Sequence, residues 1–490
     1  MKYILAIDQG TTSTRASLID HNGNIFYKSQ QEVQCLFPKE GWVEQNAIDI
    51  WLSVLNVIND LLAKTNLTYD DIDSIGLTNQ RETTVVWDKK TGMPVYNALV
   101  WQSRQSVEYC ERIKDKEALV HEKTGLVINP YFSASKIRFI LDHIENGQER
   151  AEKGELLFGT IDTWVMYKLS NHTIWKTDVT NASRTMLYNI KTLSWDDELL
   201  ALFNIPRCMM PSVEDSSHHF GNAKYLRDNL KICGVAGDQQ AALFGQSCVN
   251  VGDIKATYGT GCFVLMNIGD KPYLDNDGLI TTVGWKIGKE VVYALEGSVF
   301  IGGSAIQWLR DQMRMIKNAA ESENYAKKVK NTLGVYVVPA FVGLGAPYWD
   351  DLCRGAVFGL TRGTTKEHFI RATLNSIALQ TKDVISLMSK NANHEIASIK
   401  VDGGATSNDY LMQYQSDILG KEVGLPKNLE TTSLGAAYLA GLNNGYWKNI
   451  DEIIKINKVQ KTFTPKMCEK EIEEIDNKWA LAIKATRVFQ

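Results

Sequence analysis

The sequence has few of the features that mark membrane, secreted or disordered proteins. No window reaches the run of about 18 apolar residues that a membrane helix needs. The segment Met1–Asp8 holds only a short apolar stretch, shorter than a secretory signal requires. No segment is low in complexity, and proline accounts for only 10 of the 490 residues. These absences predict a folded, cytoplasmic protein without a membrane segment.

The chain has neither a strong excess of one sign of charge nor a cluster of cysteines. Lys and Arg number 53 against 57 Asp and Glu, a net charge of −4, so the basic excess of a nucleic-acid binder is missing. The eight cysteines form no Cys-x-x-Cys pair, and only His218 and His219 form a close pair of histidines. This pattern argues against a metal cage of His and Cys. From the balanced charge we expect no nucleic-acid partner.

Three common nucleotide-binding motifs are also missing. The sequence has no Gly-x4-Gly-Lys-Ser/Thr loop, which excludes a P-loop kinase. It lacks the His-Arg-Asp and Asp-Phe-Gly pair of protein kinases. No Gly-x-Gly-x-x-Gly follows a predicted strand, which argues against a Rossmann dehydrogenase.

The first half of the chain has the pattern of an α/β unit. Three short apolar segments predict strands at residues 2–7, 16–19 and 25–27. The last two flank Asn22-Gly23, the strongest short signal for a hairpin. Apolar residues then recur every three or four positions over 51–62, which predicts a helix capped by Asn46. Another strand is predicted at 74–77, and such alternation indicates an α/β protein.

The second half repeats this form without repeating the letters. A strand, a Gly/Thr turn and a second strand are predicted over 254–266. A long helix follows, whose predicted start is a capping box at Thr364 and Glu367. A strand at 400–402 then runs into a glycine turn.

The length of the chain calls for more than one core. A polypeptide of 490 residues exceeds one ordinary hydrophobic core. The restart of the pattern predicts a boundary near residues 246–253 and two domains, 1–246 and 247–490. Glycine turns that face each other from two α/β halves predict a cleft, the usual place for a small ligand.

The first predicted strand runs into a polar turn suited to phosphate. Gly10 admits close approach of the backbone, while the hydroxyls of residues 11–13 and the cation of Arg15 supply donors. Asp8 stands at the strand end, where a carboxylate can hold Mg²⁺ or its waters. A solvated Ser/Thr turn explains the same residues and stays open as an alternative.

Two glycine turns of the second half are weaker signals. The run Tyr258–Cys262 matches either a second phosphate turn or a tight hairpin. Small residues from Asp402 to Ala405 leave room for a flat adenine, which Asn408 can hydrogen-bond. The alternative is a strand-to-helix turn in which Asn408 is only a helix cap.

One acid and one charged dipeptide have the chemistry of an alcohol kinase. Asp238, followed by Gln239, ends an apolar strand and is either a turn residue or a general base. Arg81-Glu82 can bind the hydroxyls of a polyol, with Trp101 and Tyr131 as an aromatic wall. An Arg-Glu pair on the surface is the alternative for the dipeptide.

These motifs together resemble the FGGY family of carbohydrate kinases, which belongs to the wider actin, hexokinase and chaperone ATPase fold. The resemblance extends from about Tyr3 to Trp447, and more weakly through the C-terminal helix. The matching runs include residues 8–13, 41–44, 78–84, 158–164, 181–185, 237–246, 257–262, 339–350 and 434–441. The resemblance implies an α/β fold of two actin-like ATPase (ribonuclease H-like) domains that flank a cleft for ATP and substrate.

The run Thr78–Thr84 is the one associated with family members that act on glycerol. The resemblance therefore implies Mg²⁺- and ATP-dependent phosphorylation of glycerol to sn-glycerol 3-phosphate, the first step of glycerol catabolism. It implies a glycerol site made of Arg81, Glu82, Trp101, Tyr131, Asp238, Gln239 and Phe263. Family analogy also favours a homodimer or a homotetramer.

The same resemblance assigns the nucleotide and the metal. It implies that the phosphates contact Thr11, Thr12, Ser13 and Arg15, and that the second half contributes Thr260, Gly303, Gln307, Gly404 and Asn408. Asp8 and Asp238 would lie near Mg²⁺, with Asp238 as the catalytic base. Phe263, Gly303 and Gln307 depend on the resemblance alone.

Two alternatives remain open from the sequence. One is a kinase of another small polyol or sugar in the same family. The small, partly apolar pocket implied by Arg81, Glu82, Trp101 and Phe263 argues against it. The other is an ATP-driven switch module without a phosphate acceptor, which leaves Arg81, Glu82 and Trp101 without a role.

Overall fold

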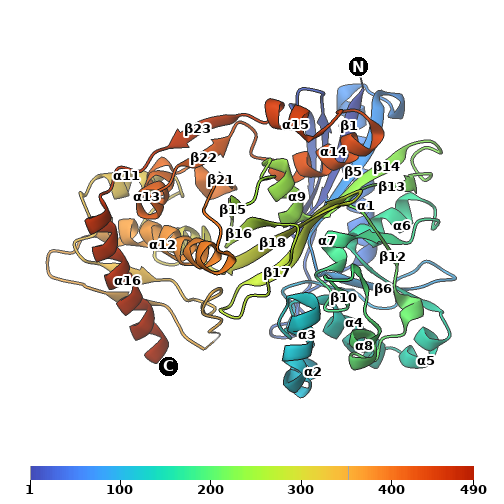
Figure 1. Cartoon of the computed structure of the whole chain (residues 1–490), viewed down its shortest axis with the longest axis horizontal. Helices are drawn as coiled ribbons and strands as arrows, with labels where there is room; N and C mark the ends of the chain where they lie inside the picture. Colours follow the sequence, from blue (N-terminus) through green and yellow to red (C-terminus); the bar gives the residue numbers. More distant parts are fainter. Residues whose placement is uncertain (1, 351, 490) are drawn as a thin grey trace.

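The computed structural model describes residues 2–350 and 352–489, and two large β-sheets form its frame (Figure 1). The first sheet has the order β13-β14-β5-β1-β2-β3. Its strands are β13 (Ser217–Asn222), β14 (Lys231–Gly237), β5 (Ile72–Asn79), β1 (Tyr3–Gln9), β2 (Ser13–Ile19) and β3 (Ile25–Glu32). Strands β1, β2 and β3 are antiparallel neighbours, whereas β1, β5 and β14 run parallel.

The second sheet repeats this topology with one additional strand. Its order is β17-β18-β16-β15-β21-β22-β23. Its strands are β17 (Ile280–Ile287), β18 (Glu290–Val299), β16 (Cys262–Gly269), β15 (Asp253–Tyr258), β21 (Ser398–Asp402), β22 (Val423–Pro426) and β23 (Val459–Phe463). Strands β15, β16 and β18 are antiparallel neighbours, and β15, β21 and β22 run parallel. The prediction that the second half repeats the first in form is therefore confirmed.

The local signals at the start of the chain are also confirmed. The hairpin between β2 and β3 turns at Gly23, whose φ of 72° suits a residue without Cβ. Helix α1 (Ala47–Thr65) begins after Asn46, whose side chain accepts a hydrogen bond from the backbone N–H of Ile48. This bond satisfies one of the free donors at the helix start.

The predicted capping box of the long helix is wrong by one residue. Helix α12 (Lys366–Ala392) begins after Thr365, which pairs with His368 rather than with Glu367. The Thr364 hydroxyl is used elsewhere, because it accepts a hydrogen bond of 2.9 Å from the backbone N–H of Thr361. The turn that precedes α12 thus uses the hydroxyl of Thr364, the residue that was expected to cap the helix.

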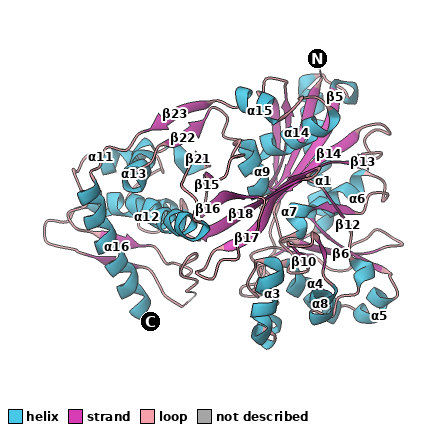
Figure 2. Ribbon diagram, viewed as in Figure 1, coloured by secondary structure: helices cyan, strands magenta, loops and turns pink. Residues whose placement is uncertain are grey.

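Two helices lie between the sheets and join them. Helix α9 (Asp238–Gly245) follows β14 directly, and α14 (Thr431–Asn444) packs against both α9 and the first sheet although it comes late in the chain. Figure 2 shows α9 and α14 between the two groups of strands. One hydrophobic cluster joins Ile4 of β1, Phe244 of α9 and Leu265 of β16, so it spans both sheets. This core fixes the place where α9, and therefore Asp238, begins.

A smaller sheet lies beside the first and carries a helical lobe. Its order is β4-β7-β6-β8, with β4 (Glu44–Gln45), β7 (Ala98–Leu99), β6 (Thr84–Asp88) and β8 (Leu156–Thr160). The lobe contains helices α2 (Val107–Arg112), α3 (Glu117–Thr124), α4 (Ser133–His143), α5 (Gly147–Glu152), α6 (Ile161–Leu169), α7 (Val179–Ala182) and α8 (Asp197–Leu202), with strands β9 (Lys176–Asp178), β10 (Tyr188–Asn189), β11 (Ser194–Trp195) and β12 (Ser212–Glu214).

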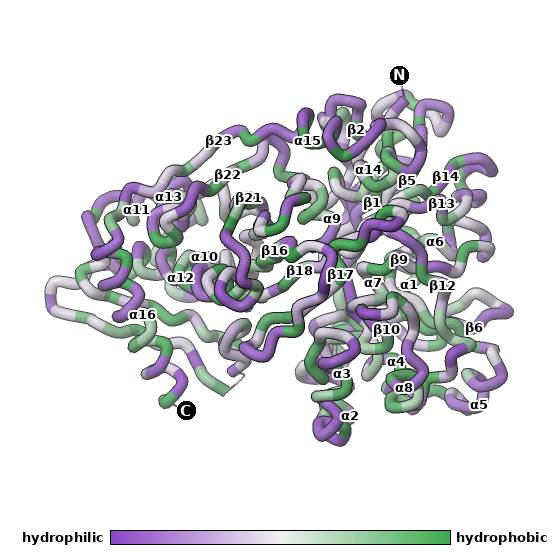
Figure 3. The backbone as a smooth tube through the Cα atoms, viewed as in Figure 1, coloured by the Kyte–Doolittle hydropathy of each residue, from purple (hydrophilic) through white to green (hydrophobic). Residues whose placement is uncertain are grey.

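The remaining elements near the second sheet are α10 (Ser304–Asp311), α11 (Glu321–Lys327), α13 (Asp409–Leu419), α16 (Glu469–Val488), β19 (Tyr336–Val338) and β20 (Ala356–Phe358). Helix α15 (Ile450–Ile456) instead packs in the cluster that includes Ile4 of β1, where its Ile453 is buried. Figure 3 shows hydrophobic stretches in the interior and hydrophilic stretches on the outer turns, as expected for a protein folded around buried sheets. Among the described residues, no helix combines the length and apolarity needed to cross a membrane.

The contact between α9 and α14 depends on glycine. A Cβ atom at Gly435 would overlap the backbone oxygen of Ala241 in α9. We predict that Gly435→Ala lowers the thermal midpoint, with a loss of about 1–3 kcal/mol, because neither backbone has room to move. Helix propensity alone predicts the opposite sign, since Ala favours a helix by about 1 kcal/mol over Gly.

Gly363→Ala is the matched control. Gly363 is exposed, and an added Cβ there would make only ordinary contact, 3.5 Å from Leu333. Its expected effect is within about 0.5 kcal/mol. Equal thermal midpoints for the two variants, measured by calorimetry, would contradict the proposed close approach of α9 and α14.

Candidate active site

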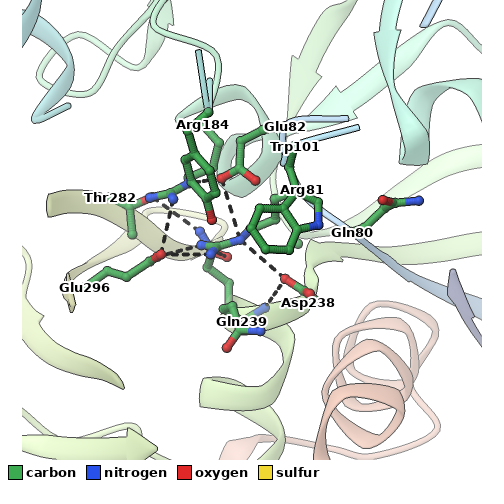
Figure 4. A network of polar contacts seen from close by, with 12 residues as sticks. Gln80, Arg81, Glu82, Trp101, Arg184, Asp238, Gln239, Thr282 and Glu296 are labelled. Carbon is green, nitrogen blue, oxygen red and sulfur yellow. Dashed lines mark hydrogen bonds and ion pairs between the residues drawn. The ribbon is translucent and has the colours of Figure 1, made fainter. Parts of the chain in front are cut away.

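Arg81 and Glu82 follow the end of β5 and are buried, so a surface ion pair is excluded. The Arg81 residue is 3% exposed and the Glu82 residue 1%. The Arg81 guanidinium binds Glu296 of β18 through two bonds, Nη1–Oε2 at 2.6 Å and Nη2–Oε1 at 2.8 Å (Figure 4). Because β5 and β18 belong to different sheets, this ion pair joins the two halves of the molecule.

Arg184 completes a buried cluster of two cations and two anions. Its Nε donates to Glu82 at 2.6 Å, and its Nη2 donates to Glu296 at 3.2 Å. Burial opposes ionisation of Glu296, but Arg184 and Arg81 lower its pKa to about 2. Burial raises the pKa of Glu82 despite the same two cations.

Asp238 lies at the edge of this cluster and remains accessible. It is the first residue of α9, and its side chain is 31% exposed. One carboxylate oxygen, Oδ1, lies 3.3 Å from Arg81 Nε and accepts a 2.7 Å hydrogen bond from the backbone N–H of Gln239. A carboxylate that is held on one side and open on the other can reach a bound alcohol.

Three aromatic rings form a wall near these charges. The ring of Trp101 lies edge-on to Tyr131 at 5.5 Å and to Phe263 at 6.4 Å between centroids. The Trp101 indole N–H also donates to the Thr11 hydroxyl at 2.9 Å. The structure thus brings the predicted aromatic residues together and attaches them to the first polar turn. Aromatic faces of this kind suit the carbon backbone of a small polyol.

The first polar turn connects β1 to β2 and holds a buried acid. The backbone N–H of Gly10 donates to the Ser13 carbonyl at 2.9 Å, which closes the turn. Asp8 is 7% exposed, and its nearest cation, Arg15, lies 3.7 Å away. Burial raises the pKa of Asp8 to about 7; Asp238 acts in the same direction, and Arg15 opposes it.

This charge distribution suits a hydrated divalent cation. The described residues contain no group of three or more His, Cys, Asp or Glu side chains that could hold a metal by themselves. Mg²⁺ usually takes only one or two carboxylates and completes its shell with water and substrate phosphates. The two acids Asp8 and Asp238 repel each other electrostatically, and a cation near both would relieve that repulsion.

The second polar turn, between β15 and β16, is tied to the start of α10. The Thr260 carbonyl accepts hydrogen bonds from the N–H groups of Gly302 at 2.8 Å and Ser304 at 3.1 Å. Gly303 precedes α10, and the N–H of Gln307 donates to the Gly303 carbonyl at 3.1 Å. The structure therefore brings Thr260, Gly303 and Gln307 into one corner.

The third turn follows β21. A Cβ at Gly404 would meet no atom within 4 Å, so space is open beside it. Asn408 caps α13 by accepting a 3.0 Å hydrogen bond from the backbone N–H of Leu411. Its amide also donates to the Ser322 hydroxyl at 3.3 Å. The capping alternative for Asn408 is thus confirmed, and its contact with a nucleotide stays a prediction.

Sequence reasoning missed Glu296, Arg184 and Lys255. Glu296 had a readable signal, because it is a single acid within the apolar run 291–299 of β18. Lys255 is likewise a single cation in β15, and it donates to the side-chain oxygen of Gln239. Arg184 had no local signal, since its neighbours are small polar residues.

Comparison with known proteins identifies the family. Residues 3–245 match the N-terminal domain of the FGGY family of carbohydrate kinases, and residues 254–443 match its C-terminal domain. A glycerol kinase of Listeria monocytogenes serotype 4a (strain HCC23) is 54% identical over 494 aligned positions, covering 100% of this chain and 99% of the relative. The chain belongs to the FGGY family of carbohydrate kinases. It is accordingly an ATP-using kinase.

Other proteins that are similar to this chain support the same family assignment. A glycerol kinase of Pediococcus pentosaceus is 56% identical, with 100% of this chain and 98% of the relative covered. The crystal structure of Plasmodium falciparum glycerol kinase with ADP superposes with a TM-score of 0.94 at 35% identity, covering 99% and 98% of the two chains. A xylulose kinase of Lactobacillus acidophilus, at 22% identity, shares the fold with a TM-score of 0.89. The predicted α/β fold of two actin-like ATPase domains is confirmed.

The raised pKa of Asp8 predicts a pH-dependent stability change in the protein free of metal and nucleotide. The ordinary pKa of an aspartate is 3.8, against about 7 for Asp8 in the folded chain. Between pH 3.8 and about 7, the folded state therefore keeps a proton on Asp8 that the unfolded state has released. The free energy of unfolding falls as the pH rises through this range, because the buried Asp8 becomes ionised. Asp8→Asn should raise the thermal midpoint at pH 8, and the gain should shrink by about 2–3 kcal/mol at pH 5.

Asp228→Asn, at an exposed loop position, is the control for the change of acid to amide. It should shift the thermal midpoint by similar, small amounts at both pH values. A gain for Asp8→Asn that is the same at pH 5 and pH 8 would show that Asp8 is not the group whose pKa is raised.

Proposed function

We propose that the chain transfers the terminal phosphoryl group of ATP to glycerol and forms sn-glycerol 3-phosphate. The observation that carries this proposal is the buried Arg81–Glu82 pair beside the half-buried carboxylate of Asp238, with the aromatic wall opposite. Identity of 54–56% to glycerol kinases over the whole chain supports the same substrate.

The polar residues of the site suit a small triol. Arg81 supplies the donors of a planar guanidinium group that Glu296 holds in one orientation, and Glu82 supplies a carboxylate acceptor. A hydroxyl group both donates and accepts, so it can bind both residues at once. The edge-on rings of Trp101 and Phe263 are proposed to limit the space along the carbon chain. A short polyol with adjacent hydroxyls fits this combination of charges and rings.

Asp238 is proposed as the general base. It takes the proton of the terminal hydroxyl while the hydroxyl oxygen forms a bond to the γ-phosphorus and the bond from that phosphorus to the ADP oxygen breaks. Phosphoryl transfer depends mainly on positioning and charge stabilisation, and a base adds roughly 10²–10⁴-fold. Arg81 Nε, 3.3 Å from the Asp238 carboxylate, holds the base toward the site.

The two polar turns are proposed to hold the nucleotide. Thr11, Thr12, Ser13 and Arg15 would bind the phosphates, and Thr260, Gly303, Gln307, Gly404 and Asn408 would contact the nucleotide from the second sheet. Asp8 and Asp238 would hold Mg²⁺, which when bound neutralises charge on the phosphate oxygens. Asp8 must then be ionised, so binding of the ion releases a proton from it where the free protein is protonated.

A panel of polyols with ATP separates glycerol from the alternative substrates. We expect kcat/KM for glycerol to exceed that for xylulose and ribulose by at least about 100-fold, because a longer chain meets the Trp101 and Phe263 rings. A higher kcat/KM for either ketose than for glycerol would refute the assigned substrate. ATP hydrolysis that no polyol stimulates would instead favour the switch module.

Asp238→Asn tests the base. The amide keeps the size of the side chain but cannot take a proton, so kcat should fall by about 10²–10⁴-fold while ATP binding is retained. Calorimetric titration with ATP and steady-state kinetics measure the two quantities. Asp228→Asn on the exposed loop should leave both unchanged. A near-normal kcat for Asp238→Asn would remove Asp238 from the role of base.

A further inference from the structure

A buried lysine contacts two residues of the proposed glycerol site. Lys255 lies in β15 and is fully buried. Its ammonium group donates a hydrogen bond to the side-chain oxygen of Gln239, and a long one of 3.5 Å to the backbone carbonyl of Phe263. Gln239 is the second residue of α9, the helix that follows the first sheet, whereas Lys255 belongs to the second sheet. This contact therefore crosses between the two halves at the substrate site.

The donor and acceptor roles in this contact determine the orientation of the Gln239 side-chain amide. An ammonium group has donors only, and a carboxamide has one oxygen acceptor and one NH₂ donor. The two orientations of an amide are distinguished by their hydrogen-bond partners. With Lys255 on the oxygen, the NH₂ group of Gln239 must point to the other side. A rotated amide would place two donors against each other in a buried position.

Charged groups from several elements surround the Lys255 ammonium. Burial and the nearby Arg81 lower the pKa of Lys255, and Asp402, Asp238 and Glu296 oppose this effect. A buried cation near three acids is favoured over an isolated one. The same charge lies close to the proposed base and to the anion that holds Arg81.

We propose that Lys255 is a positioning residue that orients the Gln239 amide so that its NH₂ group donates to a hydroxyl oxygen of the polyol. Once that oxygen accepts from Gln239, its proton is left for an acceptor, and Asp238 is the neighbouring carboxylate. The inference depends on the proposed function, since it assigns the direction of one hydrogen bond in that site. It makes Lys255 a determinant of polyol affinity, although it need not touch the substrate.

A double-mutant cycle tests whether Lys255 acts through Gln239. The variants are Lys255→Met, Gln239→Ala and the double variant, measured with the polyol that the native protein phosphorylates most efficiently. Lys255→Met should raise the KM for the polyol about tenfold, the loss of one oriented hydrogen bond, with a smaller change in kcat and none in the KM for ATP. In the Gln239→Ala background the same substitution should change the KM less than about twofold.

An equal rise of KM in both backgrounds would mean that Lys255 acts independently of Gln239, and the proposal would be overturned. Gln239→Glu supplies a second test that keeps the lysine. Glutamate can pair with Lys255 but has no NH₂ donor, so its polyol KM should rise at least as far as that of Gln239→Ala. A native KM for Gln239→Glu would refute the donor role even if Lys255→Met fails to fold.

The native protein is the reference for all variants. If the native protein does not phosphorylate glycerol, the proposed function is contradicted. The role of Lys255 is decided separately, by the KM values of the variants for whichever polyol the native protein phosphorylates. Thermal midpoints of all variants, measured without substrate, separate loss of folding from loss of affinity.

Discussion

The buried ion pair between Arg81 and Glu296 is the constraint on which the site depends. It joins a turn of the first sheet to a strand of the second, and both side chains are almost completely removed from water. Removing one partner of such a pair costs about 3–5 kcal/mol, because the other charge is left buried alone. The buried pair is therefore stable only together with the neighbouring charges that balance it, which Arg184 and Glu82 supply. Arg81 then has one fixed orientation, from which it reaches Asp238.

The repeated topology explains why a phosphoryl donor and an acceptor can meet here. Each sheet ends one hairpin in a polar turn, the first at residues 10–12 and the second at residues 259–261. Helix α9 begins between the sheets and places Asp238 near both Asp8 and Arg81. The close glycine contact between α9 and α14 limits movement of that helix start. The start of α9 therefore brings the proposed base close to the proposed metal ligand and to Arg81.

Local signals predicted the frame, and contacts distant in sequence could not be predicted. The Asn22-Gly23 hairpin, the Asn46 cap and the restart after β14 depend on neighbouring residues, and all are present. The Thr365 cap differs from the prediction because a turn competes for the adjacent hydroxyl. Glu296 lies 215 positions from Arg81, so no periodicity connects them. The residues predicted to bind the polyol do gather in space, but the ions that hold them, Glu296, Arg184 and Lys255, emerge only from the three-dimensional arrangement.

The most direct test of this account is a crystal structure of the protein with glycerol and ADP bound. We expect glycerol between Arg81, Glu82 and Trp101, with its terminal hydroxyl oxygen within about 3.2 Å of an Asp238 carboxylate oxygen. We also expect the Arg81–Glu296 pair intact and the side-chain nitrogen of Gln239 facing the ligand. Glycerol bound away from Arg81 and Asp238, or an Asp238 carboxylate turned away from every hydroxyl of the bound glycerol, would contradict this mechanism.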